Sequence, residues 1–179
     1  PEVLTARVLI KTGDNVTTDD IMPAGSAILP LRSNIPAIAE HVFEKIDPAF
    51  ASRAREAGSG VILGGDNYGQ GSSREHAALA PMYLGVRAVL ARSFARIHKA
   101  NLINFGILPL TFENPEDYDT NEQGDEIVIE GLLESLAKGT PLSAFNRTRN
   151  ATYILRHECS GRLAAVAAAG GLLNYTRGR

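Results

Sequence analysis

Short apolar runs recur along the chain, each bounded by glycine, proline or polar residues. Runs of this kind between turn-forming residues are typical of buried strands. They predict strands at residues 6–10, 61–63, 87–91, 107–112, 125–130 and 152–156. Pro109 lies inside one of these runs and indicates an edge or an irregular position in the sheet, because proline cannot donate a hydrogen bond to a neighbouring strand.

Between these runs, apolar residues recur at helical spacing and predict helices. Asp47 and Ser93 stand where N-caps are expected, and Gly58 and Gly106 stand where helices end. A glycine pair at residues 170–171 weakens or breaks the last of these helices. The predicted helices cover residues 35–43, 47–57, 93–105 and 161–175, and a further helix begins at Ser72.

Strands and helices alternate between residues 61 and 112, which favours a right-handed parallel arrangement. No internal repeat or low-complexity linker divides the chain. We therefore expect one mixed α/β domain over residues 1–179, with several helices packed on a small sheet or barrel.

A glycine-rich turn joins the strand at residues 61–63 to the helix that follows. Ser72 and Glu75 have the spacing of a capping box, so Ser72 is the expected N-cap of that helix. A helix N-terminus presents unpaired N–H groups and the positive end of a dipole, and Arg74 adds a charge suited to a carboxylate. The pattern fits an anion site, and it also fits a loop that only starts a helix. Its glycines match neither phosphate-binding motif, which argues against nucleotide binding.

Residues 13–34 form a long polar stretch without a clear helical or strand pattern. Loops of this length in a compact domain are often functional. Asp19 and Arg32 are the charged residues of this stretch with an obvious use at an active site. The alternative is that both are solvated loop charges.

Composition excludes several classes of function. Of the 179 residues, 44% are hydrophobic and 21% charged, with a net charge of −2 and no basic patch, so neither a nucleic-acid surface nor a membrane span is expected. Cys159 is the single cysteine, which fits a reducing cytosol and cannot by itself hold a zinc ion or an iron–sulfur cluster. The four histidines show no metal-ligand spacing. Pro1 fits either removal of an initiator methionine or a cut inside a longer polypeptide.

Several longer motifs resemble the swivel domain of the aconitase family. They are D-N-Y-G-Q-G-S-S-R-E-H-A at residues 66–77 and R-S-F-A-R-I-H at residues 92–98, supported by T-T-D at 17–19, L-P-L-R-S-N at 29–34 and G-I-L-P-L-T at 106–111. The terminal G-G-L-L-N-Y at residues 170–175 resembles the end of some bacterial aconitases. The resemblance covers the chain from about Arg7 to Tyr175.

The resemblance implies a swivelling β/β/α domain, the carboxy-terminal part of an enzyme with three further domains. Those domains carry a [4Fe–4S] cluster, and the active site lies between them and the swivel domain. The implied reaction interconverts citrate and isocitrate through cis-aconitate in the tricarboxylic acid cycle. This chain would then be inactive without the cluster-bearing domains, whether they share its polypeptide or form a large subunit.

The resemblance also assigns roles to individual residues. Ser72 matches the catalytic base, and Ser73 and Arg74 match its neighbours that contact substrate. Arg32 matches an arginine that clamps a substrate carboxylate, and Asp19 matches an active-site aspartate. A helix N-terminus beside an arginine would favour the alkoxide form that a serine base needs.

Other residues of these motifs are expected to have structural roles. Asp20 stands where aconitases usually carry a histidine, which alters the local hydrogen bonding of the loop. His76 and His98 are expected to be packed, hydrogen-bonded histidines within helices. We expect Cys159 to be a buried or idle thiol, and residues 67–68 to shape the turn.

Two other functions compete with the aconitase swivel domain. Small subunits of isopropylmalate or homoaconitate isomerases share the G-S-S-R-E-H loop, and the segment at residues 21–46 separates them from aconitases. Here Arg32 is available for a third carboxylate, where isopropylmalate enzymes present an apolar group. The third function is a non-catalytic RNA-binding module, which the composition supports poorly.

Overall fold

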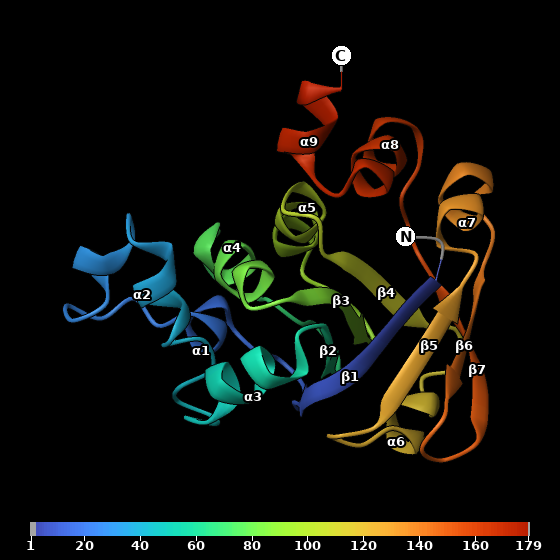
Figure 1. The fold of residues 1–179 in the computed structure, drawn as a ribbon, viewed down its shortest axis with the longest axis horizontal. Coiled ribbons are helices and arrows are strands. Elements are labelled where there is room, and N and C mark those ends of the chain that lie inside the picture. Colours follow the sequence, from blue (N-terminus) through green and yellow to red (C-terminus); the bar gives the residue numbers. More distant parts are fainter. Residues whose placement is uncertain (1–2, 179) are drawn as a thin grey trace.

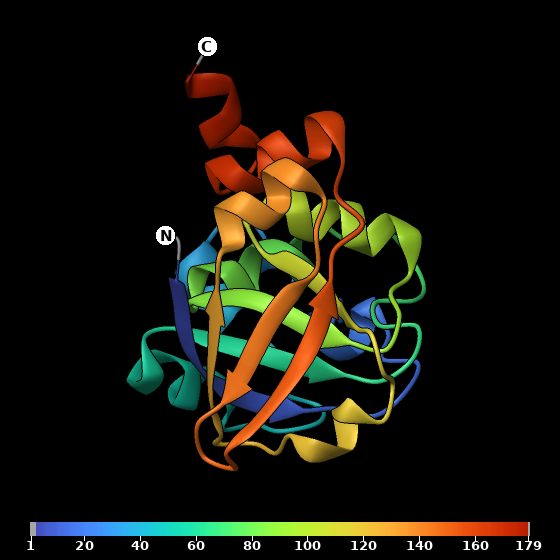
Figure 2. The same cartoon turned by 90° about the vertical axis from the view of Figure 1, so that its right-hand side faces the viewer.

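The computed structural model describes residues 3–178, and within them seven strands close into a barrel (Figures 1 and 2). Pro1 lies outside the described residues. The strands are β1 (Val3–Lys11), β2 (Gly60–Gly64), β3 (Val86–Ala91), β4 (Leu108–Phe112), β5 (Glu126–Glu130), β6 (Leu142–Asn146) and β7 (Ala151–Arg156). Around the barrel their order is β1-β2-β3-β4-β7-β6-β5.

The barrel has a parallel half and an antiparallel half. Strands β1, β2, β3 and β4 run parallel to one another, as the alternation of strands and helices predicts. The remaining pairs are antiparallel, and Figure 2 shows β6 and β7 as a hairpin in front. Pro109 pairs in register with Val89 of β3 and lies outside the short pairing of β4 with β7, so this part of β4 has a paired strand on one side only.

Helices cover the outer face of the parallel half and one end of the barrel. In Figure 1 the helices from α1 to α4 gather on the side of β1–β3 away from the antiparallel strands, and α8 and α9 lie together beyond α5. The helices are α1 (Thr18–Ile21), α2 (Ile35–Ala39), α3 (Phe50–Ala57), α4 (His76–Tyr83), α5 (Arg96–Asn104), α6 (Asp117–Thr120), α7 (Leu132–Lys138), α8 (Gly161–Ala169) and α9 (Leu172–Arg177), with a 3₁₀ turn at Leu29–Leu31. Among residues 3–178, no helix combines the length and apolar character needed to cross a membrane.

Alternate residues of the parallel strands serve two hydrophobic cores. Val61 and Leu63 of β2 point into the barrel, while Ile62 packs under the helices. In β3, Leu90 faces the interior and Val89 the helices. Because both faces are buried, these strands read as continuous apolar runs, and that is why the sequence reveals them.

The carboxyl ends of β1, β2 and β3 lie side by side, so the loops that follow them meet. Thr12 N–H donates to the Leu63 carbonyl at 2.9 Å, and Gly65 N–H donates to the Gly13 carbonyl at 3.1 Å. Arg92 N–H donates to the Gly65 carbonyl at 3.1 Å. Loops at the carboxyl edge of parallel strands are where α/β proteins place their sites.

The mixed α/β architecture with a barrel and flanking helices is confirmed, as are the six predicted strands. The break in the terminal helix at Gly170 is also confirmed, since α8 ends there with a positive φ of 86°. Strand β6, helix α7 and the short helix α1 are additional. The predicted helix at residues 35–43 ends earlier, at Ala39.

Three predicted helix starts are wrong. Helix α4 begins at His76 rather than Ser72, α5 at Arg96 rather than after Ser93, and α3 at Phe50 rather than after Asp47. For Ser72 and Ser93, contacts with distant segments hold the expected cap residue in the preceding loop, whereas Asp47 bonds nearby residues, Ala49 and Arg53. Ser93 Oγ, for example, accepts a 2.8 Å hydrogen bond from Asn67 N–H of the glycine turn.

Asp20 has a structural role that the sequence did not reveal. Its Oδ2 accepts from Thr17 N–H at 3.0 Å, and its own N–H donates to Thr17 Oγ1 at 2.9 Å. These two bonds form a capping box at the start of α1, the short helix that carries Asp19.

We expect Asp20→Ala to lower the free energy of unfolding by about 1 kcal/mol, because the replacement leaves Thr17 N–H without its acceptor. Asp20→Glu is the matched control, since glutamate is the usual partner in a capping box. Urea denaturation of the three proteins measures the effect. Equal stability of the alanine and glutamate variants would contradict this role.

Candidate functional site

The structure brings Ser72, Ser73, Arg74 and Asp19 together at the carboxyl edge of the parallel strands. The chain around Thr18 runs beside the end of the glycine turn: Thr18 N–H donates to the Gln70 carbonyl at 2.9 Å, and Thr18 Oγ1 donates to the Ser72 carbonyl at 2.8 Å. The loop after β1 therefore holds the loop after β2 in place. Two segments more than 50 residues apart become one site.

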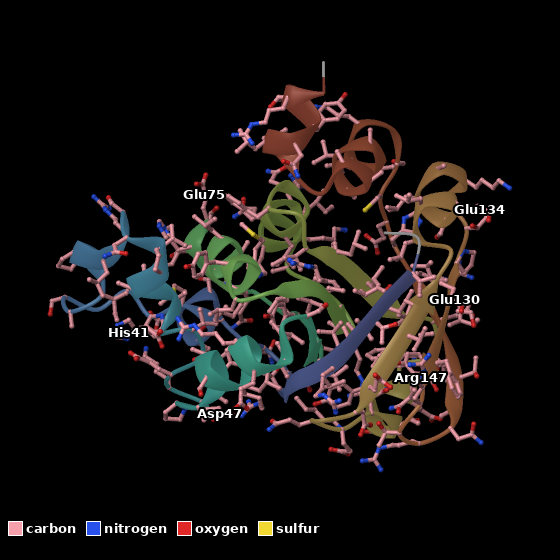
Figure 3. All side chains as sticks on the ribbon, viewed as in Figure 1. His41, Asp47, Glu75, Glu130, Glu134 and Arg147 are labelled. Atoms are coloured by element: carbon pink, nitrogen blue, oxygen red, sulfur yellow. The ribbon has the colours of Figure 1, made fainter. Side chains whose placement is uncertain are left out.

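Ser72 is exposed, and within residues 3–178 nothing hydrogen-bonds to its Oγ. Gly71, just before it, has a φ of 102°, a conformation that favours glycine. The backbone then continues as a loop until α4 begins at His76, so Ser72 is not an N-cap and the expected capping box with Glu75 does not form. Glu75 instead points away from the barrel (Figure 3). The free hydroxyl is available to a substrate, but it is not activated by capping a helix.

Arg74 is held by an ion pair with Asp19. Its Nη1 lies 3.0 Å from Asp19 Oδ1, and both side chains are partly exposed. The other oxygen of Asp19 pairs with Lys45, and Ala24 N–H donates to Oδ1 at 3.3 Å. One guanidinium edge is thereby fixed, which leaves the remaining donors of Arg74 free to bind a carboxylate.

These contacts lower the pKa of Asp19 to about 2, with the Lys45 ammonium as the largest cause and the Arg74 guanidinium next. A carboxyl whose pKa is depressed in the folded protein stabilises it above the unfolded value of 3.8, and the contribution is lost as the pH falls towards 2. Asp19 is therefore ionised at neutral pH, and its carboxylate holds the Arg74 guanidinium.

Arg32 lies in the loop directly after the 3₁₀ turn at Leu29–Leu31. His76 Nε2 donates to the Arg32 carbonyl at 2.7 Å, which ties this loop to the start of α4. Arg32 and Arg74 line one pocket of about 310 Å³, together with Ser73 and the apolar side chains of Met22, Ile28 and Ile38. Two arginines thus share a pocket with several apolar side chains, and Glu75 also lines it.

A second pocket of about 300 Å³ lies between the glycine turn and the start of α5. Ser72 and His98 line it, and Ser73 lines both pockets. Residues 71–75, which we call the serine loop, therefore lie between the two pockets. Together these pockets could hold a molecule with more than one polar group. All five residues expected at the site lie at these pockets or contact a residue that does.

Sequence reasoning missed Lys45 and Thr18, and it misjudged His98. Lys45 carries no motif signal, whereas Thr18 sits beside Asp19 in a recognisable run. His76 is hydrogen-bonded, as expected. His98 is buried, but neither ring nitrogen has a hydrogen-bond partner in the described part of the chain, so the expectation of a hydrogen-bonded histidine is wrong for it.

The remaining structural expectations are confirmed. Tyr68 is fully buried, and Asn67 adopts a positive φ of 55° in the turn, where its Nδ2 donates to Gln70 Oε1 at 2.6 Å. Cys159 is buried next to Leu136 and Val166, and burial raises the pKa of its thiol.

The side chains do not fit a cluster or a metal on this chain. Iron–sulfur clusters are held by several cysteine thiolates, and Cys159 is a single buried thiol in an apolar environment. Across residues 3–178, no group of three or more histidine, cysteine or acidic side chains could hold a metal ion. In the aconitase family the [4Fe–4S] cluster belongs to other domains.

Comparison with known proteins places these features in a family. Residues 40–115 match the model of the aconitase C-terminal domain. The 3-isopropylmalate dehydratase small subunit of Aquifex aeolicus is 40% identical over 172 residues, which cover 93% of this chain and 90% of that protein. A probable mitochondrial aconitate hydratase of Caenorhabditis elegans is 38% identical over 94% of this chain, but the chain spans only 25% of that protein's length.

The fold agrees with a solved structure. The crystal structure of 3-isopropylmalate dehydratase from Methanocaldococcus jannaschii superposes with a TM-score of 0.81 at 34% identity, covering 99% of this chain and 95% of that one. Relatives therefore include both aconitate hydratases and isopropylmalate dehydratase small subunits. With similarity along nearly the whole chain and the serine loop at its centre, this chain belongs to the aconitase family, as its C-terminal or swivel domain.

Proposed function

We propose that this chain forms one half of the active site of a hydro-lyase that removes and adds water on a hydroxy acid with at least two carboxylates. The observation that carries the proposal is the serine loop itself. Ser72 presents a free hydroxyl, and Arg74, fixed by Asp19, lies two residues further along the same loop. Removal of a proton from the carbon next to a carboxylate requires an accessible base and, beside it, a group that binds the carboxylate. Ser72 and Arg74 are suited to these two tasks.

In this reaction Ser72 Oγ would take the proton from the carbon next to a carboxylate and return it in the reverse direction. A serine hydroxyl is a poor base unless its alkoxide is stabilised. The start of α4 does not supply it, because that helix begins at His76 and Ser72 is not its N-cap. The positive charge of Arg74 would supply part of it. Arg74 would also hold the carboxylate that acidifies the proton.

The other half of the site would come from a cluster-bearing partner. Residues 3–178 offer neither a cluster nor a metal site, and the relatives named as small subunits belong to enzymes with another component. The partner could be a large subunit or further domains of the same polypeptide. Departure of the hydroxyl group would be its task.

Relatives that this chain matches over most of their own length support 3-isopropylmalate as the substrate. Two of them are named as 3-isopropylmalate dehydratase small subunits, and the solved structure is named as a 3-isopropylmalate dehydratase. The apolar side chains of Met22, Ile28 and Ile38 beside Arg74 suit an isopropyl group. In this case the chain would be a small subunit of the isopropylmalate dehydratase type.

Citrate and isocitrate are the second candidate, and Arg32 favours them. It lines the same pocket as Arg74, so two arginines face a space in which a tricarboxylate could place two of its carboxylates. 3-Isopropylmalate has an isopropyl group in place of the third carboxylate, so it would offer no partner for the Arg32 guanidinium. In this case the chain would be the swivel domain of an aconitate hydratase.

Replacing the base should abolish turnover. In the complex with its cluster-bearing partner, Ser72→Ala is expected to lower kcat at least 10²-fold, the usual range for loss of a general base, without a change in thermal stability. Ser52→Ala, at an exposed position of α3, is the control and should retain full activity. Near-normal turnover of Ser72→Ala would overturn the assignment of the base.

Arg32 separates the two substrates. If citrate is the substrate, Arg32→Gln should raise KM for citrate about 10- to 100-fold, because a charge-assisted hydrogen bond contributes roughly 1.5–3 kcal/mol. If 3-isopropylmalate is the substrate, the same variant should change its KM less than threefold. Steady-state assays of both acids with wild type and variant distinguish the two cases.

Asp19 would act by positioning Arg74, and the pKa of Asp19 depends on its ion pairs with Lys45 and Arg74. We expect Lys45→Met to raise the pKa of Asp19 from about 2 towards 3.8, because the ammonium is the largest cause of the shift. Titration of the carboxyl carbon by NMR measures it. Lys138→Met, which removes a remote ion pair with Glu134, is the control and should leave the Asp19 titration unchanged. An unaltered midpoint in Lys45→Met would contradict the ion-pair network.

A further inference from the structure

The pocket between the glycine turn and α5 has features that the proposed chemistry does not use. Its volume is about 300 Å³, and its polar lining consists of Thr18, Ser72, Ser73, Arg96 and His98. Arg96 is exposed at its rim. No acidic side chain is among the described residues that line it, so Arg96 gives this lining a net positive charge.

Helix α5 begins in this pocket. Its first intrahelical hydrogen bond runs from Lys99 N–H to the Ala95 carbonyl at 3.0 Å, so the N–H groups of residues 96–98 come before the helical ladder. Within the described chain no side chain caps this end, because Ser93, the expected cap, is engaged by Asn67. Ala95 N–H is taken up by the Tyr68 carbonyl. A helix end with free amides and a positive dipole attracts an anion.

His98 is a second and independent sign of a missing ligand. Its side chain is 1% exposed, yet both ring nitrogens lack a hydrogen-bond partner among residues 3–178. A buried polar group in this state is destabilising unless something binds it. The ring is fixed in place, since it packs 5.6 Å from the Tyr68 ring and a Cβ on Gly69 would come within 2.2 Å of Cδ2.

Burial also lowers the pKa of His98 to about 4, so its imidazole is neutral at pH 7. A neutral ring keeps one N–H donor and one acceptor nitrogen. The donor can bind an anion directly, without the ring first taking up a proton.

We propose that this pocket is a carboxylate-binding site, formed by the free amides at the start of α5, the His98 ring and the Arg96 guanidinium. Ser72 lines the pocket and Arg74 lies on the far side of Ser73, so a molecule with one carboxylate here and another at Arg74 would extend across the base. The carboxylate belongs either to the substrate or to an acidic side chain of the partner. Only the choice between these sources rests on the proposed function.

Titration of the isotope-labelled chain with malonate, observed by NMR, tests the site without any turnover. Saturable shifts are expected at the amides of residues 96–98 and at the His98 ring nitrogens, and sodium chloride at matched ionic strength should not reproduce them. Absence of these shifts would overturn the proposal. Because no activity is measured, the result is independent of whether Ser72 proves to be the base.

His98→Phe keeps a ring of similar size and removes both nitrogens. It should weaken malonate binding at least tenfold while leaving the urea midpoint unchanged or higher, since no internal hydrogen bond is lost. His157→Phe is the matched control. That histidine bonds the Ser135 carbonyl at 2.9 Å far from the pocket, so its variant should lower the midpoint and bind malonate normally. Wild-type binding by His98→Phe would overturn the proposal.

The complex reconstituted with its cluster-bearing partner identifies the source of the carboxylate. A tenfold rise in KM for His98→Phe, with unchanged affinity for the partner, would assign the carboxylate to the substrate. A tenfold loss of partner affinity with unchanged KM would assign it to the partner. If neither quantity changes, the pocket binds no carboxylate in the working enzyme and the proposal fails.

Discussion

The site depends on the contact between the loop after β1 and the glycine turn after β2. The Val16 carbonyl accepts hydrogen bonds from both Gly69 and Gln70, at 2.7 and 3.1 Å, and Thr18 donates to the carbonyls of Gln70 and Ser72. These bonds hold the backbone of residues 69–72 against the loop after β1, and so they fix the position of the loop that carries Ser72 and Arg74. Parallel strands make the contact possible, because they bring their carboxyl ends, and the loops that follow, to one edge of the barrel.

Charge organises the same edge. Asp19 is the one acid among the residues expected at the site, and two cations neutralise it. Its carboxylate therefore holds Arg74, and the two cations leave no net negative charge at Asp19. Arg32 and Arg96 add positive charge on either side of the serine loop. The surface around Ser72 is thus suited to an acid with several carboxylates, although the chain as a whole carries a net charge of −2.

The sequence predicted most of the fold because the parallel strands are buried on both faces and leave continuous apolar runs. It predicted the location of the site because the residues of the serine loop are consecutive. The starts of α4 and α5 could not be predicted, since Ser72 and Ser93 have the right side chains for caps but are held in the preceding loops by contacts with distant segments. Asp47 bonds Ala49 N–H locally, and α3 begins one turn later, at Phe50. Strand β6 was missed because one of the buried positions of Leu142–Asn146 is the polar Asn146, which hides the apolar alternation of a half-buried strand.

Local chemistry alone determined that a serine and an arginine follow a glycine turn, and that one cysteine cannot hold a cluster. Only the tertiary structure decided what surrounds them. It pairs Asp19 with Lys45 and Arg74 and places Arg32 and Arg74 in the lining of one pocket. It also buries His98 near Ser72, with no hydrogen-bond partner among residues 3–178. The physical reason is that each of these relations joins segments far apart in the chain. Spacing along the sequence encodes only what neighbouring residues do to one another.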